Sequence, residues 1–263
     1  MGQDLKGKIA WLVGASGAIG KAVAGALIRE GATVVLSSRT PASLEAIALD
    51  LKKSSAGTVT ALPLDATDQG QVETAAREIH QKFGRIDLLI NTTSLSKFGD
   101  FLQLTDEDWL AVYQNKLFVY LRTIRAVLPY MIKQEYGRIV NVSGRGGHQP
   151  TLPVHLPGMS ANAAINLLTK GLANMYGRSG IRVNAVAPGP VVSPRYEAIL
   201  STNESLGNEA SHPAISTFNT APVINERAAP DEIADVVVFL LSDRSRVMTG
   251  TILQADGGST ASL

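Results

Sequence analysis

The stretch KIAWLVGASGAIGKAVAGALIREGATVVLSSR, residues 8–39, decides the fold of this chain. It opens with the apolar run KIAWLV (8–13), turns through GASGAIG (14–20) into a helical pattern (19–30), and ends in the β-branched run TVVLS (33–37). Two such strands joined by a helix predict a parallel βαβ unit. Glycines in the first turn let backbone N–H groups approach a pyrophosphate, which the helix N-terminus favours electrostatically. The sequence therefore predicts a dinucleotide-binding unit in this stretch.

The same rhythm of strand and helix continues along the chain. Further strands are expected at 59–64, 86–90, 137–143, 181–187 and 251–255, and further helices at 70–83, 105–133, 158–177 and 230–241. This alternation predicts a central parallel sheet of about seven strands with helices on both faces. No repeat, low-complexity tract or break in composition interrupts the rhythm. We therefore expect a single doubly wound, Rossmann-type α/β domain over residues 1–263.

The composition excludes several classes of site and partner. A net charge of +1 with 18% charged residues leaves no basic excess for nucleic-acid phosphates. There is no cysteine for a disulfide, a thiolate nucleophile or a metal, and the four histidines lack metal-ligand spacing. No apolar run approaches the roughly 18 residues of a membrane span. We expect a soluble, cytoplasmic protein that acts on a small molecule, without a metal, a nucleic acid or a membrane as partner.

The end of the second strand indicates which dinucleotide binds. An NAD site normally offers an Asp or Glu there to the ribose hydroxyls, but VVLSSRT has Ser38 followed by Arg39. A guanidinium binds a 2′-phosphate through several hydrogen bonds, whereas a carboxylate would repel it. We therefore predict NADP(H) in preference to NAD(H). The alternative role for Arg39 is that of a solvated surface charge.

With these motifs the chain resembles the short-chain dehydrogenase/reductase (SDR) family over nearly its whole length. The family's Thr-Gly-x3-Gly-x-Gly loop corresponds to Val13, Gly14, Ala18 and Gly20, with Gly17 next to the replaced glycine. The resemblance implies cofactor contacts at Gly14, Ser16, Gly17, Ile19, Gly20, Ser38, Arg39, Asp65, Asn91, Asn162, Pro188, Gly189, Val191 and Ser193.

Further motifs support this resemblance in chain order. Asp65 corresponds to the acid that the family places beside the adenine ring, and Asn91 to the first residue of its Asn-Asn-Ala-Gly motif. PGPVVS (188–193) matches Pro-Gly-x3-Thr with Ser193 for Thr, and QADGG (254–258) is similar to a C-terminal Asp-Gly-Gly. Together these motifs are specific for the family.

The helix GMSANAAINLLTKGLA (158–173) lacks the residues that the resemblance leads us to expect. In the family, a Ser and a Tyr-x3-Lys pair carry the chemistry: the Tyr exchanges a proton with the substrate oxygen, and the Lys lowers the phenol pKa and holds the nicotinamide ribose. Aligned without gaps on its Thr-Lys end (169–170), the helix has Gly158 in place of Tyr and Asn162 in place of Lys. Gly144 takes the place of the Ser.

No shift of the alignment restores the missing pair. No tyrosine occurs between Tyr136 and Tyr176, and no lysine occurs between Lys133 and Lys170. General acid–base catalysis contributes about 10² to 10⁴ in rate, and orientation of the reacting atoms contributes as much or more, so hydride transfer can persist. The developing alkoxide of a ketone still needs a proton or hydrogen-bond donors.

Four residues are left as catalytic candidates: Asn115, Ser143, His155 and Asn162. Asn115 sits where the family keeps a structural and catalytic Asn, and Ser143 directly precedes the position of the family's Ser. His155 lies seven residues before Asn162, the separation at which divergent enoyl reductases of the superfamily carry a Tyr ahead of their Lys, and histidine titrates in the range that suits a proton donor. The alternative for His155 is packing within a Pro-rich loop. Asn162 can bind ribose hydroxyls through its amide.

Two other side chains in the segment 144–158 have weaker claims. His148 lacks the positional argument that favours His155. Arg145 is able to bind an anion, but we expect it on the surface.

The polar stretch 193–227 occupies the place of the family's substrate-covering loop, which predicts a mobile lid. Arg195 and Tyr196 stand nearest the cofactor motif and either touch substrate or anchor the lid. By resemblance, the helices 105–133 and 158–177 are those that pair between subunits, so we expect a homodimer or a homotetramer.

Two functions remain open. The first is an NADP(H)-dependent oxidoreductase that transfers hydride to or from a small carbonyl, alcohol or C=N compound with a non-standard proton donor. A cationic C=N substrate is a variant of it, since hydride addition then gives a neutral amine. The second is a catalytically silent NADP(H)-binding protein that acts as a sensor or an assembly partner. The substrate-loop candidate and the cofactor motifs favour the enzyme.

Overall fold

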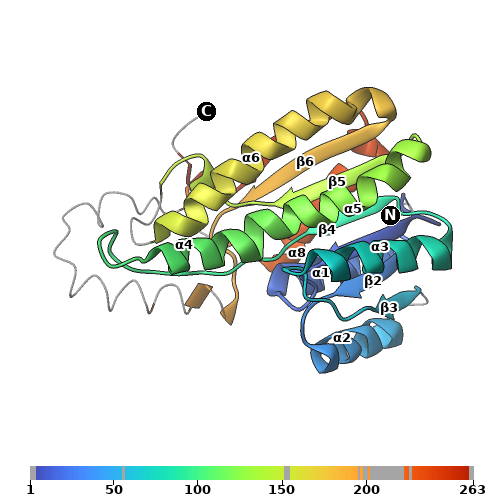
Figure 1. The fold of residues 1–263 in the computed structure, drawn as a ribbon, viewed down its shortest axis with the longest axis horizontal. Coiled ribbons are helices and arrows are strands. Elements are labelled where there is room, and N and C mark those ends of the chain that lie inside the picture. Colours follow the sequence, from blue (N-terminus) through green and yellow to red (C-terminus); the bar gives the residue numbers. More distant parts are fainter. Residues whose placement is uncertain are drawn as a thin grey trace.

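The computed structural model describes residues 4–54, 57–150, 155–194, 196–197, 201, 222–224 and 227–260. Seven parallel strands form one sheet in the order β3-β2-β1-β4-β5-β6-β7 (Figure 1). The strands are β1 Ile9–Val13, β2 Thr33–Ser37, β3 Val59–Ala61, β4 Leu88–Asn91, β5 Gly137–Val142, β6 Ile181–Pro188 and β7 Ile252–Ala255. The chain order reverses between β1 and β4, which confirms the predicted doubly wound Rossmann-type domain.

Helices cover both faces of this sheet. They are α1 Ala18–Arg29, α2 Pro41–Ser54, α3 Gln69–Phe83, α4 Asp106–Tyr113, α5 Val119–Lys133, α6 Leu156–Tyr176 and α8 Pro230–Leu241. One core lies between the sheet and α1, α2 and α8, and it contains Leu12 and Leu27. The other lies between the sheet and α3, α5 and α6, and it contains Trp11 and Tyr120. Neighbouring residues of β1 therefore alternate between two buried faces, which explains why this strand is apolar throughout.

The helix predicted over 105–133 is interrupted in the middle. The chain passes from α4 through the π-helix η1 (Gln114–Phe118) into α5, which continues across Pro129. Short π-turns inside helices are frequent at functional sites. Thr105 caps this helical stretch in a capping box with Asp108.

Two other differences from the predicted elements concern α6 and α2. The segment predicted as irregular at 144–158 contains a 3₁₀ turn, η2 (Arg145–Gly147), and α6 begins at Leu156. Residues 151–154 of this segment lie outside the described residues. The helix α2 was not among the expected elements, and it begins at a proline, which suits a first helical position.

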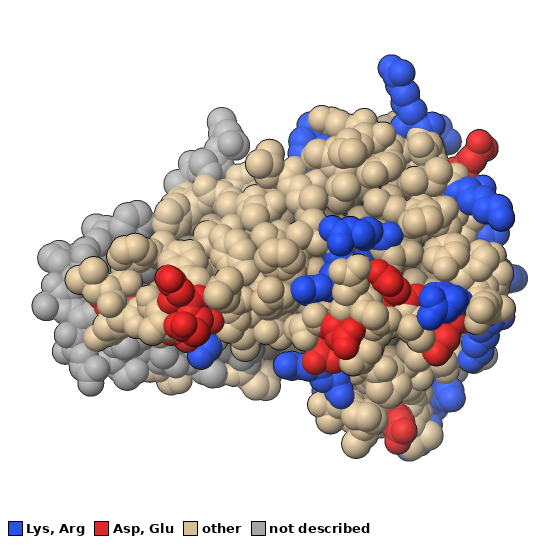
Figure 2. Space-filling view, in the orientation of Figure 1, with Lys and Arg blue, Asp and Glu red and all other residues tan. Residues whose placement is uncertain are grey.

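Charge is unevenly distributed over the surface. Figure 2 shows Lys, Arg, Asp and Glu side chains gathered over the part of the molecule that contains α2 and α3, while the face over α6 is largely uncharged.

No helix within the described residues is both long and apolar enough to cross a lipid bilayer.

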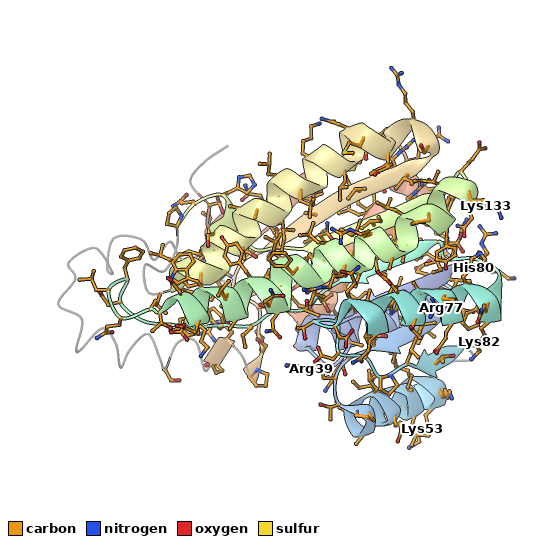
Figure 3. All side chains as sticks on the ribbon, in the orientation of Figure 1. Arg39, Lys53, Arg77, His80, Lys82 and Lys133 are labelled. Carbon is orange, nitrogen blue, oxygen red and sulfur yellow. The ribbon has the colours of Figure 1, made fainter. Side chains whose placement is uncertain are left out.

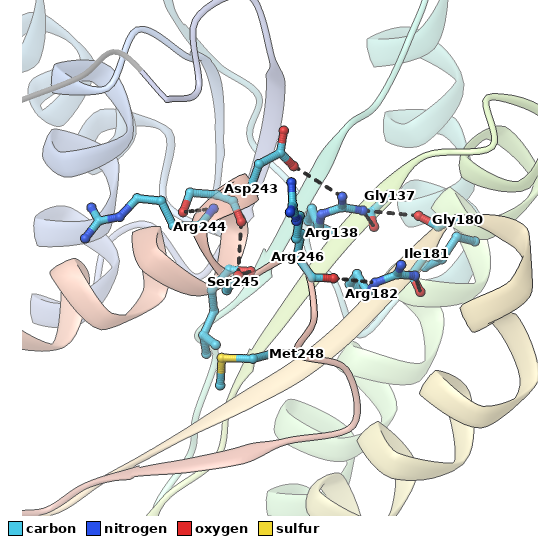
Figure 4. Close-up of polar contacts among 12 residues, drawn as sticks. Gly137, Arg138, Gly180, Ile181, Arg182, Asp243, Arg244, Ser245, Arg246 and Met248 are labelled. Carbon is cyan, nitrogen blue, oxygen red and sulfur yellow. Dashed lines mark hydrogen bonds and ion pairs between the residues drawn. The ribbon is translucent and has the colours of Figure 1, made fainter.

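An ion pair and a hydrogen bond fasten the amino ends of β5 and β6. Figure 3 shows Arg39 well separated from Lys133, which ends α5. Arg138, at the start of β5, reaches the Asp243 carboxylate at 3.4 Å, and Arg182, at the start of β6, donates its Nε–H to the carbonyl of Arg246 at 3.2 Å (Figure 4). These contacts tie the strand starts to the segment around residues 243–246, while the opposite, carboxyl edge of the sheet is where such folds bind ligands.

Candidate active site

The turn between β1 and α1 is built for close approach of a ligand to the backbone. Gly14 has a φ of +93°, a left-handed conformation, and a Cβ there would lie 2.6 Å from Thr92 Oγ1. A Cβ on Gly20 would collide with the carbonyl oxygen of Gly14. Gly17 is the N-cap of α1 and makes no side-chain capping bond, so the backbone N–H groups of the first turn are left for an anion.

A cleft follows the carboxyl edge of the sheet from this turn. Its volume is about 850 Å³ including its open mouth. It brings together the predicted residues Gly14, Ser16, Gly17, Ser38, Arg39, Asp65 and Asn115, and its other lining residues are Val13, Thr40, Leu64, Ala66, Thr67, Thr92, Thr93, Ser94 and Val119. The lining is therefore mixed, with hydroxyl groups, one guanidinium and one carboxylate among apolar residues.

Two hydroxyl groups of this cleft are candidates for hydrogen bonds to a ligand. Ser38 Oγ and Thr93 Oγ1 are buried and have no hydrogen-bond partner among the described residues. Buried hydroxyls in native structures normally have a partner. Asp65 Oδ1 already accepts from the N–H and the hydroxyl of Thr67, at 3.0 and 2.8 Å. The glycine turn, the orphaned hydroxyls and the exposed guanidinium of Arg39 fit a phosphorylated dinucleotide.

Asn91 does not reach the cleft. Its side chain is fully buried, where Nδ2 donates to Asn141 Oδ1 at 3.1 Å and Oδ1 accepts from the Thr123 hydroxyl at 2.8 Å. These bonds tie β4 to β5 and α5. The side chain of Asn91 therefore has a structural role, and the cofactor contact that the resemblance implies for this residue stays a prediction. Ile19 likewise packs against the core formed by α1 and α8.

The segment from Pro188 to Ser193 begins with the last residue of β6, at the carboxyl edge. Gly189 donates its N–H to the carbonyl of Ala255 at 3.1 Å, and Val191 is buried in a bridge to Ala228. Ser193 Oγ donates to the carbonyl of Val191 at 3.2 Å. This segment therefore lies beside the end of β7. Most of the lid predicted at 193–227, Arg195 included, lies outside the described residues.

The imidazole of His155 lies where the Cβ atom of a side chain at position 158 would be. A Cβ on Gly158 would collide with His155 Nε2. The ring stacks on Phe98 with centroids 4.5 Å apart, and Nδ1 lies 3.2 Å from the carbonyl oxygen of Lys97. Because a carbonyl only accepts, Nδ1 carries the proton in this bond, so Nε2 is the acceptor of the neutral ring.

The loop that seats this imidazole is anchored to α4. Lys97 Nζ pairs with Asp108 Oδ1 at 3.0 Å. The hydrogen bond from Lys97, followed by those from the backbone of Thr105, lowers the pKa of the Asp108 carboxyl. Asp108 is therefore ionised at neutral pH, and the pair holds Lys97 and the carbonyl that orients His155.

The remaining catalytic candidates converge on the end of β5. A Cβ on Gly144 would lie 2.8 Å from Asn162 Nδ2, so the glycine makes room for the amide. Asn162 Oδ1 is buried without a hydrogen-bond partner among the described residues. Ser143 is buried, and its hydroxyl donates to the carbonyl of Val186 at 3.3 Å. Asn115 Nδ2 donates back to the carbonyl of Ala111 at 2.9 Å. Asn162 thus offers a buried acceptor to a ligand.

Arg145 is buried, and the expectation that it lies on the surface was wrong. It is 8% exposed, because η2 packs closely against α6 through Gly146 and Gly147. Burial lowers the pKa of its guanidinium, and electrostatic interactions with Tyr196 and Asp256 offset part of that effect. It still carries its charge at neutral pH. His148, three residues further on, is exposed.

Sequence reasoning missed two residues at this edge, Thr92 and Lys116. The Thr92 hydroxyl lies 3.0 Å from the carbonyl oxygens of both Val13 and Gly14 and so fastens the glycine turn to β4. Lys116 is 5% exposed and donates from Nζ to the carbonyl of Ser143 at 3.1 Å. Its signal in the sequence is a charge at helical spacing from the apolar Tyr120, four residues on.

Comparison with known proteins agrees with this geometry. Residues 14–260 match the family model described as Enoyl-(Acyl carrier protein) reductase. The chain is 33% identical over 254 residues to the 3-oxoacyl-[acyl-carrier-protein] reductase FabG of Thermotoga maritima, covering 97% of this chain and 98% of that protein. It is 34% identical over 256 residues to the oxidoreductase UcpA of Escherichia coli, covering 97% and 95%. The crystal structure of L-sorbose reductase from Gluconobacter frateurii, complexed with NADPH and L-sorbose, superimposes with a TM-score of 0.88 at 26% identity and full coverage of both chains. The chain belongs to the short-chain dehydrogenase/reductase family of oxidoreductases.

Proposed function

We propose that this protein transfers hydride between NADP(H) and a small carbonyl or alcohol compound, and that His155 handles the proton. In this proposal Gly144, Gly158 and Asn162 stand in place of the family's Ser, Tyr and Lys. The observation that carries it is the collision between a Cβ on Gly158 and His155 Nε2. The imidazole occupies the room of the side chain that, by resemblance, is the family's acid.

The residues of the cleft would hold NADP(H) in an extended arrangement. The first turn of α1 would bind the pyrophosphate, Ser38 and Arg39 the 2′-phosphate, and Asp65 the adenine. Asn162 and the segment 188–193 would hold the nicotinamide half. When bound, NADP(H) supplies or accepts the hydride. The relatives support this choice of cofactor, since the L-sorbose reductase crystal contains NADPH.

The proton path follows from the tautomer of His155. With Nδ1–H donating to the carbonyl of Lys97, the imidazolium donates from Nε2 during carbonyl reduction, and the neutral ring accepts at Nε2 during alcohol oxidation. A phenol at position 158 would carry its hydroxyl further into the site than this ring reaches. A bound water therefore relays the proton between Nε2 and the substrate oxygen.

A neutral carbonyl suits the site better than a cationic C=N compound. Lys116 and Arg145 both bring buried positive charge to the end of β5. Such charge stabilises a developing alkoxide and repels a cationic substrate.

The test of this proposal is steady NADPH consumption by the purified protein with a panel of ketones, oxidised sugars and imines. Turnover with ketones well above the uncatalysed rate supports it. Tight NADPH binding without turnover on the whole panel would instead identify a silent cofactor-binding protein.

Replacing Arg39 by glutamate is expected to weaken NADPH binding by about 10- to 100-fold. A charge-assisted hydrogen bond contributes about 1.5 to 3 kcal/mol, and the new carboxylate adds repulsion of the 2′-phosphate. NADH lacks that phosphate, so its affinity stays within a factor of about two or rises. Dissociation constants of both cofactors measure this. Lys53→Glu makes the same charge change on the exposed face of α2 and is the control. Equal losses for both cofactors would contradict the assignment of Arg39.

We further propose that the chain assembles with a second copy of itself through α5 and α6. A groove between these helices is lined by Leu121, Ile124, Arg125, Leu128, Pro129, Ile132, Leu168, Leu172 and Tyr176. On the same helix α6, Leu167 and Met175 are 76% and 69% exposed. Apolar surface of this extent marks interaction sites, and light scattering of the purified protein measures the assembly.

A further inference from the structure

Lys116 is a buried, charged residue that takes no part in the proton path proposed above. It lies in η1, next to Asn115, and Nζ donates to the carbonyl oxygen of Ser143 at 3.1 Å. One turn later the Tyr120 hydroxyl donates to the carbonyl of Val142 at 2.8 Å. Both side chains therefore hold the carboxyl end of β5. The phenol does so as a neutral group, whereas the ammonium brings a full charge that is costly to bury.

This charge lies one peptide unit away from Asn162. The carbonyl that Lys116 binds belongs to the peptide between Ser143 and Gly144. Gly144 in turn contacts the Asn162 amide, since a Cβ there would lie 2.8 Å from Nδ2. By resemblance, Asn162 stands where the family carries a lysine on α6. The ammonium group of Lys116 comes from η1 and thus lies in the same part of the site as the position of the family's lysine on α6.

The end of β5 belongs to the nicotinamide half of the proposed cofactor site. In a doubly wound sheet, a dinucleotide lies across the point where the strand order reverses, here between β1 and β4. Ser38 and Arg39 follow β2, on one side of that point, and they would take the adenosine half. The nicotinamide half then falls on the other side, over the ends of β4, β5 and β6.

We propose that Lys116 supplies positive charge to the nicotinamide half-site, in place of the lysine that the family carries on α6. It is a positioning residue that acts through the Ser143–Gly144 peptide and through its electric field. The inference rests on the proposed binding of NADP(H). The nicotinamide ring is cationic in NADP⁺ and neutral in NADPH, so a buried cation close to it weakens the binding of NADP⁺ relative to NADPH. A lysine that only supports the fold affects both forms alike.

The experiment is calorimetric titration of NADP⁺ and NADPH into the full-length protein at one pH and salt concentration. Lys116→Met is expected to lower the ratio of the two dissociation constants, Kd(NADP⁺) over Kd(NADPH), by about threefold or more. Lys116→Gln, which keeps a hydrogen-bond donor and loses the charge, should lower it similarly. Lys116→Arg, which keeps the charge, should hold the ratio of the wild type. Lys133→Met is the matched control, because this lysine is exposed at the far end of α5.

Each outcome decides between the two proposals. An unchanged ratio in a folded Lys116→Met or Lys116→Gln protein, checked by its thermal transition, overturns the role of Lys116 and leaves NADP(H) binding intact. If Lys116→Met does not fold, Lys116→Gln alone decides. If neither variant folds, a Lys116→Arg protein whose ratio differs from that of the wild type also counts against the role of Lys116. A wild-type protein that binds neither form overturns the proposed function and this inference with it.

Discussion

Replacing His155 by alanine is expected to lower the rate of NADPH-dependent carbonyl reduction by about 10²- to 10⁴-fold, the usual contribution of a general acid. NADPH affinity should stay within a factor of about two, because the imidazole is not among the residues lining the cleft that would hold the adenosine half. The kinetic constants and the dissociation constant of NADPH, measured on the same preparation, test both statements. Full activity in His155→Ala would exclude this residue as the proton donor.

The pH dependence separates a proton donor from a packing residue. In the wild type, carbonyl reduction should slow and alcohol oxidation should accelerate as the pH rises, since reduction needs Nε2–H and oxidation needs the free Nε2. His155→Ala should show neither trend. His80→Ala is the control: this ring stacks on Tyr130 with centroids 4.4 Å apart, on α3 and α5.

The cleft around the glycine turn was predictable because its signals are local in the sequence. Gly14 and Gly17 sit in a turn between a buried strand and a helix, and Ser38 and Arg39 directly follow the next strand. In a parallel sheet, the ends of adjacent strands must meet at one edge. A correct assignment of β1, α1 and β2 is therefore enough to bring these residues into one cleft.

The direction of a single side chain could not be predicted in the same way. Asn91 ends β4 beside the cleft, yet its side chain turns between the sheet and α5, where Asn141 and Thr123 satisfy it. Arg145 follows β5 in a polar stretch, yet the glycines after it let η2 press against α6 and bury the guanidinium. Both outcomes depend on partners far away in the chain. A single sequence does not show such partners.

Lys116, in contrast, has a local signal in the sequence that predicts its burial. It lies at helical spacing from Val112 and Tyr120, both buried, so the pattern predicts a charge on the apolar face of its helix. A buried charge needs compensation, and this makes it a candidate for a functional role. By resemblance, the lysine of this half of the site is expected on α6, whereas Lys116 lies in η1.

Returning the family's pair to α6 is expected to succeed only when His155 is removed. Gly158→Tyr with Asn162→Lys places a Cβ where His155 Nε2 lies, so the imidazole must move and the phenol cannot take its usual place. Carbonyl reduction should then fall to about the level of His155→Ala. Adding His155→Ala to the same pair gives the phenol room next to a lysine one turn away, and the rate should rise by about 10²-fold or more over His155→Ala alone.

The effect of His155→Ala on the rate is expected to change sign when the family's pair is restored. His155→Ala lowers the rate in the natural chain and raises it in the chain with the restored pair, and only two groups that compete for one space and one task give such a reversal. Gly171→Tyr on the exposed face of α6, where a Cβ meets nothing within 4 Å, controls for the bulk of a new tyrosine, and thermal transitions of all variants control for folding. If His155→Ala has the same effect on the rate in both chains, the imidazole and the family's phenol do not share a site, and the proton must enter from another side.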